Sequence, residues 1–165
     1  MNFEASLRVE GYASLFGRPD SAGDVVMAGA FAASLARRPP AAVKMLFQHD
    51  PAQPIGIWTD IREDRHGLKA SGMLAAGVAR AEDIARLIRL GALDGLSIGF
   101  RTVRAARDRA TGLRLLRAVD LWEISIVTFP LLSEARIMGQ RQPAPVPLPM
   151  TTAAAIRAAA RSFLT

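Results

Sequence analysis

The sequence predicts a mainly β domain, a barrel or a sandwich, with peripheral helices. About seven short segments alternate or run apolar in the manner of strands, and only two segments have helical periodicity. Strands and helices do not alternate regularly, as they would in a parallel α/β fold. Half of the 165 residues are hydrophobic, which is enough apolar material for a sizeable core.

The predicted strands are short apolar or alternating runs bounded by turn residues. In chain order they are residues 7–13, 43–47, 55–61, 68–74, 93–104, 113–118 and 121–129. Residues 63–67 favour a hairpin turn between two of these strands, and Pro130 ends the last one. Two segments rich in Gly, Pro and Asp, residues 17–23 and 50–54, are predicted to be loops.

Residues 79–90 carry the clearest helical pattern, with leucine and isoleucine side chains on one stripe and charged side chains on the rest. Gly91 is well placed to end this helix. Residues 31–38 predict a shorter helix, which must stop because two consecutive prolines follow it.

The composition changes after residue 142. Prolines alternate with Ala, Val and Leu over residues 143–149, a pattern typical of a stiff, extended linker. Two threonines then favour the start of a short helix that runs to Leu164. We therefore predict a domain over residues 1–140, followed by a Pro-rich linker and a short C-terminal helix over residues 141–165.

Charge and composition exclude several function classes. The net charge is +6, but the basic residues are spread along the chain and no interleaved aromatic set is present to stack on bases. We expect a solvated basic surface and no specific nucleic-acid partner. No apolar run approaches the ~20 residues of a membrane span, so no membrane partner is expected. The absence of cysteine excludes a thiol nucleophile, and a reducing, cytoplasmic setting fits best.

Of the two histidines, His49 is the candidate for chemistry. It comes where a predicted buried strand opens into a loop, a position that fixes a side chain while admitting a substrate. A structural role is the alternative, and His66 is expected to be a solvated turn residue. Two isolated histidines without cysteine do not make a usual zinc site, and no Gly-rich phosphate loop is present. We therefore expect no metal and no cofactor.

Ser97 is flanked by Gly95 and Gly99, which share its face in a strand. The glycines are expected to leave room for a substrate backbone, although they could instead mark a bulge or bend. The segment also matches the Gly-x-Ser-x-Gly elbow of α/β-hydrolases. That match fails because both histidines precede the serine and no helical periodicity follows it.

Glu123 lies in the strongly apolar run of residues 121–129. A carboxylate there is costly unless it is paired, and a histidine N–H is a suitable partner; an edge-strand Glu facing water is the alternative. Alternation puts Glu123 and Ser125 on one face and Trp122, with two isoleucines, on the other. Ser125 is a rival nucleophile, but it lacks the flanking glycines of Ser97.

Other acids remain open as the third member of a triad. Asp20 or Asp24 would give the chain order of subtilisin, whose parallel α/β architecture is hard to fit into so few residues. Asp60 or Asp64 would give the order found in chymotrypsin, and chain order alone does not exclude it.

Four stretches, taken in order, resemble a known family. They are Gly-Tyr-Ala-Ser-Leu-Phe-Gly at 11–17 with residues 24–31, Leu-Phe-Gln-His-Asp-Pro at 46–51 with Pro-Ile-Gly at 54–56, residues 91–100, and residues 121–130. Together they resemble the prohead (capsid maturation) proteases of tailed phages, whose fold is similar to that of herpesvirus assemblin. The resemblance runs from about residue 10 to residue 137.

The resemblance implies an assemblin-like closed β-barrel of about seven strands and a serine endopeptidase activity. The family's catalytic histidine lies in the Gln-His-Asp stretch, here His49, and its serine in the Leu-Ser-Ile-Gly stretch, here Ser97. Assemblin uses a second histidine as third member. This sequence has no histidine after His66, so Glu123 is expected to take that role.

The resemblance also implies partners and a setting. The expected substrate is the scaffolding segment of the major capsid protein, and often the protease's own tail, cleaved inside the assembling procapsid in the bacterial cytoplasm. Dimerisation is expected by analogy with the family. The chain is short for the family, as a protease of a phage-derived gene-transfer particle could be. The alternatives are a catalytically inactive capsid assembly or scaffolding protein and a nucleic-acid-binding β domain.

Overall fold

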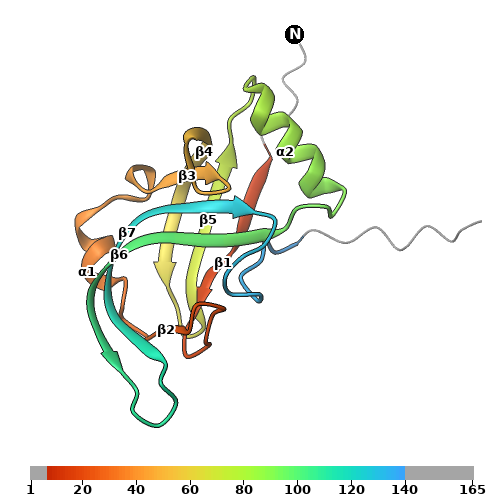
Figure 1. Ribbon diagram of the computed structural model, residues 1–165. Coiled ribbons are helices and arrows are strands. Elements are labelled where there is room, and N and C mark those ends of the chain that lie inside the picture. Colours follow the sequence, from red (N-terminus) through yellow and green to blue (C-terminus); the bar gives the residue numbers. More distant parts are fainter. Residues whose placement is uncertain (1–6, 140–165) are drawn as a thin grey trace, which may run out of the picture.

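The structure is a computed structural model that describes residues 7–139. Within these residues the chain forms one curled, seven-stranded sheet with two α-helices (Figure 1). The strands are β1 (Arg8–Leu15), β2 (Asp24–Val26), β3 (Lys44–Phe47), β4 (Asp50–Glu63), β5 (Gly67–Leu74), β6 (Gly95–Arg107) and β7 (Arg114–Val127); the helices are α1 (Ala32–Arg37), α2 (Ala79–Arg89) and the 3₁₀ turn η1 (Pro40–Ala42). The prediction of a mainly β domain with peripheral helices is therefore confirmed.

The sheet has the strand order β1-β5-β4-β3-β7-β2, and β6 pairs with β7 beside this path. Strand β7 pairs with three other strands: β3 and β2 pair with it in parallel, and β6 pairs with it antiparallel. In Figure 1, β6 and β7 run together across the sheet and continue beyond it as a projecting hairpin. Residues far apart in the sequence therefore meet along β7.

The expectation of a closed barrel is wrong. In the described part of the chain, β1 and β6 form no ladder with each other; a short turn segment lies between them. Arg136 makes a single bridge to Gly95 of β6, and Ile137 makes a single bridge to Gly11 of β1. The sheet curls strongly but stays open, because two isolated bridges replace a continuous row of strand hydrogen bonds.

The core lies on the concave side of the sheet. Trp58 of β4 is fully buried there, and its indole N–H donates a hydrogen bond to the carbonyl oxygen of Ile124 (3.2 Å). Helix α2 closes one end of the core with Ile84 and Ile88, as its apolar stripe predicts. The buried aromatic and aliphatic side chains supply most of the apolar area removed from water.

Several element predictions need correction. The predicted loop at residues 50–54 is the start of β4, because only two residues separate it from β3. The two strands predicted at 113–118 and 121–129 are the single strand β7, and the three-residue β2 was missed because so short a segment has no periodicity.

In the residues that the structure describes, no helix is long and apolar enough to cross a membrane.

A bulge in β7 changes one predicted face. Gly99 pairs with Glu123, but the next residue of β6, Phe100, pairs with Leu121, so Trp122 has no partner in the ladder. As a result Leu121 is buried, whereas Trp122 is 53% exposed and donates its indole N–H to Asp120 Oδ2 (2.8 Å). The prediction that Trp122 shares the face of the buried isoleucines is therefore wrong.

The predicted boundary near residue 140 and the predicted linker and helix at 141–165 lie outside the described residues.

The two tryptophans make a matched test of the core. Trp58→Ala is expected to lower the free energy of unfolding by about 3–5 kcal/mol, because it empties a fully buried site. Trp122→Ala is expected to have a much smaller effect, because its side chain is half exposed. Urea unfolding followed by circular dichroism measures both changes. Equal losses in the two variants would contradict the described core.

Candidate active site

The candidate residues gather where β3, β7 and β6 lie side by side. Ser97 of β6 pairs with Ser125 of β7, and Gly99 pairs with Glu123. Residues directly opposite each other on paired strands present their side chains to the same face. Ile124 and Ile126 of β7 point into the core, so Ser97, Glu123 and Ser125 lie on the opposite face of the sheet.

The turn between β3 and β4 brings His49 to this face. Gln48 and His49 both adopt positive φ angles, 54° and 60°, which non-glycine residues rarely do. The turn is held against β7: the main-chain N–H of Gln48 donates to the carbonyl of Ile126 (3.0 Å), and the Gln48 side-chain amide donates to Thr128 Oγ1 (2.7 Å). These hydrogen bonds offset the local backbone strain.

The structure brings His49 and Glu123 into direct contact. His49 Nδ1 lies 2.5 Å from Glu123 Oε1, a close hydrogen bond between an imidazole ring and a carboxylate. This hydrogen bond raises the pKa of His49, and partial burial of the ring opposes the shift. Because Nδ1 carries the proton donated to Glu123, Nε2 of the neutral ring is left free to accept a proton.

Ser125 connects the same two residues a second time. Its hydroxyl donates to Glu123 Oε2 (2.6 Å) and accepts a hydrogen bond from the main-chain N–H of His49 (3.1 Å). Both oxygens of the Glu123 carboxylate are therefore engaged, one by the histidine ring and one by the serine. Sequence reasoning missed this role, although the shared face of Glu123 and Ser125 was a signal for it.

The two glycines beside Ser97 leave room for neighbouring residues of this chain. A side chain at position 99 would overlap the Glu123 carboxylate, and one at position 95 would overlap Pro130 and the carbonyl of Val127. The expectation that both glycines leave open space for a substrate is therefore wrong, because their neighbours fill it. Gly99 also adjoins the bulge at Trp122, so the alternative that a glycine marks a bulge is confirmed there.

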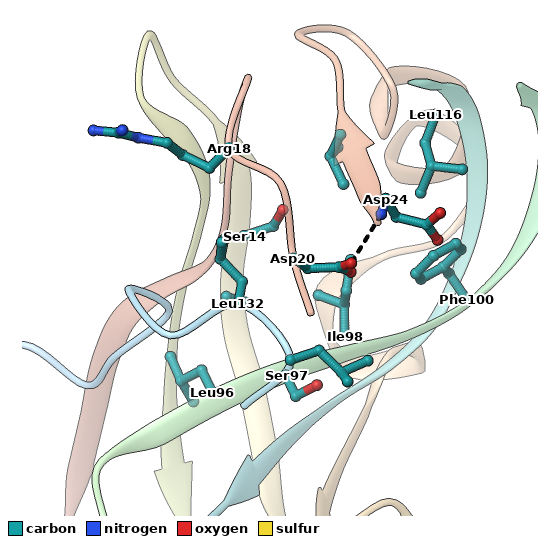
Figure 2. A pocket seen from close by; sticks show the side chains of 13 residues that line it. Ser14, Arg18, Asp20, Asp24, Leu96, Ser97, Ile98, Phe100, Leu116 and Leu132 are labelled. Carbon is teal, nitrogen blue, oxygen red and sulfur yellow. Dashed lines mark hydrogen bonds between the residues drawn. The ribbon is translucent and has the colours of Figure 1, made fainter. Parts of the chain in front are cut away.

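Ser97 is buried, at 5% exposure, and lines a small cavity beside β6 (Figure 2). The cavity wall is mostly apolar and includes Leu96, Leu116 and Leu132, while the guanidinium of Arg18 points away from it in Figure 2. The structure places Ser97 next to Ser125, but within the described residues no hydrogen bond joins Ser97 to the His49 ring.

The other acids weighed from the sequence have partners elsewhere. Asp20 accepts the main-chain N–H of Asp24 (2.9 Å), drawn in Figure 2, and Asp24 itself pairs with Arg114. Asp60 pairs with Arg62. Asp64 accepts hydrogen bonds from the Tyr12 hydroxyl and two turn amides, which lower its pKa to about 2. Among these candidate acids, Glu123 is the one that contacts His49.

Comparison with known proteins gives a consistent result. The model of a family described as caudovirus prohead serine protease matches residues 2–148. The prohead protease of Enterobacteria phage HK97 is 34% identical over 134 residues, covering 80% of this chain and 59% of that protein. The prohead protease of Escherichia phage T5 is 32% identical over 134 residues, covering 77% and 60%. The chain thus spans about three fifths of the length of these relatives.

Two solved structures share the fold. The bacteriophage T4 capsid assembly protease matches with a TM-score of 0.61 at 15% identity, covering 74% of this chain and 81% of that one. The KSHV protease in complex with a hexapeptide phosphonate inhibitor matches with a TM-score of 0.51 at 14% identity, covering 76% and 60%. At these identities the likeness concerns the fold, a curled, mainly β sheet with few helices.

The contact with Glu123 predicts that His49 titrates above its ordinary pKa of about 6.5. Glu123→Gln is expected to lower the His49 pKa, because the neutral amide no longer stabilises the imidazolium. NMR titration of the histidine ring protons measures both values, and His66→Gln assigns the remaining signal. Glu134→Gln, at an exposed ion pair with Arg18, is the control and should leave the titration unchanged.

The same shift sets a pH dependence of stability. Since the pKa of His49 is raised in the folded state, the stabilisation from the His49–Glu123 pair is fully present below the unfolded-state pKa and is lost as the pH rises through the folded-state pKa.

In the NMR titration, a His49 pKa that does not respond to Glu123→Gln would contradict the described contact.

Proposed function

The chain belongs to the caudovirus prohead serine protease family, and from this we propose that it is a serine endopeptidase with Ser97 as nucleophile. In this proposal His49 is the general base and Glu123 is the acid that orients it. The observation that carries the assignment is the 2.5 Å contact between His49 Nδ1 and Glu123 Oε1, on the sheet face that Ser97 shares. The family supports the serine and the histidine, and the contact supports the acid.

The reaction is acyl transfer. Ser97 Oγ attacks the scissile carbonyl while His49 Nε2 takes its proton, which requires these two atoms to approach to about 3 Å. The resulting imidazolium returns a proton to the leaving amine, and water releases the acyl group in a second, equivalent step. Glu123 keeps the proton on Nδ1 and stabilises the charged ring through both steps. These reaction steps require no cofactor and no metal.

The proposed substrate is the scaffolding segment of the major capsid protein. The family description and the names of the HK97 and T5 relatives, all prohead proteases, support a substrate in the capsid, and the scaffolding segment is what the resemblance to the family implies. The setting is the assembling procapsid in the bacterial cytoplasm, and a homodimer follows from the same family analogy. In this scheme residues 1–140 are the protease domain, and the Pro-rich residues 143–149 are the candidate site of self-cleavage.

Ser97→Ala is expected to abolish processing of the capsid protein, because it removes the attacking oxygen. The chain is co-expressed with the capsid protein of its own phage or particle, and mass spectrometry of the capsid protein reads its mature N-terminus. Ser133→Ala, an exposed serine whose hydroxyl contacts Glu134, is the matched control and should process normally. Normal processing by Ser97→Ala, or a full-length capsid protein with the wild-type chain, would support the alternative of an inactive assembly protein.

Glu123→Gln is expected to lower kcat/KM about 10²–10⁴-fold, because the amide neither fixes the Nδ1–H tautomer nor stabilises the imidazolium. The rate is measured with a peptide that spans the cleavage site found above. Glu134→Gln again serves as control. An unchanged rate in Glu123→Gln would assign the third role to another residue.

A further inference from the structure

We propose that Ser125 is a positioning residue for the catalytic base, and that its hydroxyl holds both the main chain and the ring of His49 in place. This inference rests on the proposed function. The hydroxyl binds the His49 main chain directly and binds the His49 ring through Glu123. The contacts form a closed ring of hydrogen bonds: His49 N–H donates to Ser125 Oγ, Ser125 O–H donates to Glu123 Oε2, and His49 Nδ1–H donates to Glu123 Oε1.

The chemistry of the partners fixes the direction of each hydrogen bond around Ser125. A main-chain N–H can only donate, and an ionised carboxylate can only accept. The single hydroxyl proton must therefore point at Glu123 Oε2, and a lone pair must face the His49 N–H. A hydroxyl serves both partners at once, and an alanine at position 125 serves neither.

Burial makes this arrangement sensitive to substitution. Ser125 is 0% exposed and the Glu123 side chain is 13% exposed, so water has little access to replace a lost contact. The His49 N–H also lies in a turn whose two central residues have positive φ angles. Such strained conformations persist only where surrounding contacts hold them, and the hydroxyl of Ser125 is one of those contacts.

The same geometry argues against Ser125 as the nucleophile. The Ser125 hydroxyl donates its proton to the Glu123 carboxylate. His49 contacts the Ser125 oxygen through its main-chain N–H, which cannot accept a proton. Ser97, which lies directly opposite on β6, has no such partner among the described hydrogen bonds. The two serines of the pair thus have separate roles, one held by hydrogen bonds and one free to react.

Ser125→Ala is expected to lower kcat about 10- to 100-fold with little change in KM, because the base loses its alignment while the substrate contacts remain. The contact between Glu123 and the ring loosens as well, so the pKa of His49 should fall toward its ordinary value. The acid limb of the pH–rate profile then moves to lower pH.

Ser34→Ala is the matched control. Ser34 is a buried serine, 1% exposed, whose hydroxyl likewise bridges a main-chain N–H, that of Leu121 (2.9 Å), and a carboxylate, that of Asp120 (3.4 Å). It lies on α1, and its described hydrogen bonds involve neither His49 nor Glu123. A general loss of a buried serine hydroxyl should lower the melting temperature in both variants, but only Ser125→Ala should move the pH profile and the His49 titration.

The experiment combines pH–rate profiles with NMR titration of His49 in the full chain. The titration is recorded in the Ser97→Ala background and needs no turnover, so it tests Ser125 even if the proposed protease activity fails. A lower His49 pKa in Ser125→Ala, but not in Ser34→Ala, supports the proposal. An unchanged pKa in Ser125→Ala, a kcat within twofold of wild type, or the same shift in Ser34→Ala would overturn it.

Discussion

The contact between a carboxylate and a histidine ring, made across two strands, is the interaction on which the site depends. His49 lies just after β3 and Glu123 lies in β7, 74 residues apart in the chain, and the parallel pairing of these strands brings them together. Because β6 pairs with the other edge of β7, Ser97 lies on the same face. The curled sheet therefore serves the site chiefly by placing β7 between the two strands that carry the other candidates.

Holding a carboxylate in a mostly buried position requires compensation. Two hydrogen bonds provide this compensation for Glu123: the ring of His49 donates to one carboxylate oxygen, and the hydroxyl of Ser125 donates to the other. Gly99 completes the arrangement from β6, because any side chain there would occupy the place of the carboxylate. The site is thus built from ordinary strand neighbours, and among the described residues the hydrogen bonds to the carboxylate come from the sheet and its β3–β4 turn.

Local patterns in the sequence predicted the parts that depend on local physics. The apolar stripe of α2, the hairpin turn at residues 63–67 and the cost of a charged residue in an apolar run gave correct expectations, including a histidine partner for Glu123. The features that were missed depend on distant contacts. They are the open edge between β1 and β6, the left-handed turn at His49 and the close approach of Glu123 to Gly99. All three depend on which strands pair, and a local stretch of sequence does not determine that pairing.

The central claim is that Ser97 reacts and that His49 activates it. Covalent labelling with a peptidyl phosphonate ester tests this most directly, because such reagents modify an activated serine and mass spectrometry locates the adduct. We predict an adduct on Ser97 that disappears in His49→Ala. An adduct on Ser125, or labelling of Ser97 that persists at the same rate in His49→Ala, would contradict the account.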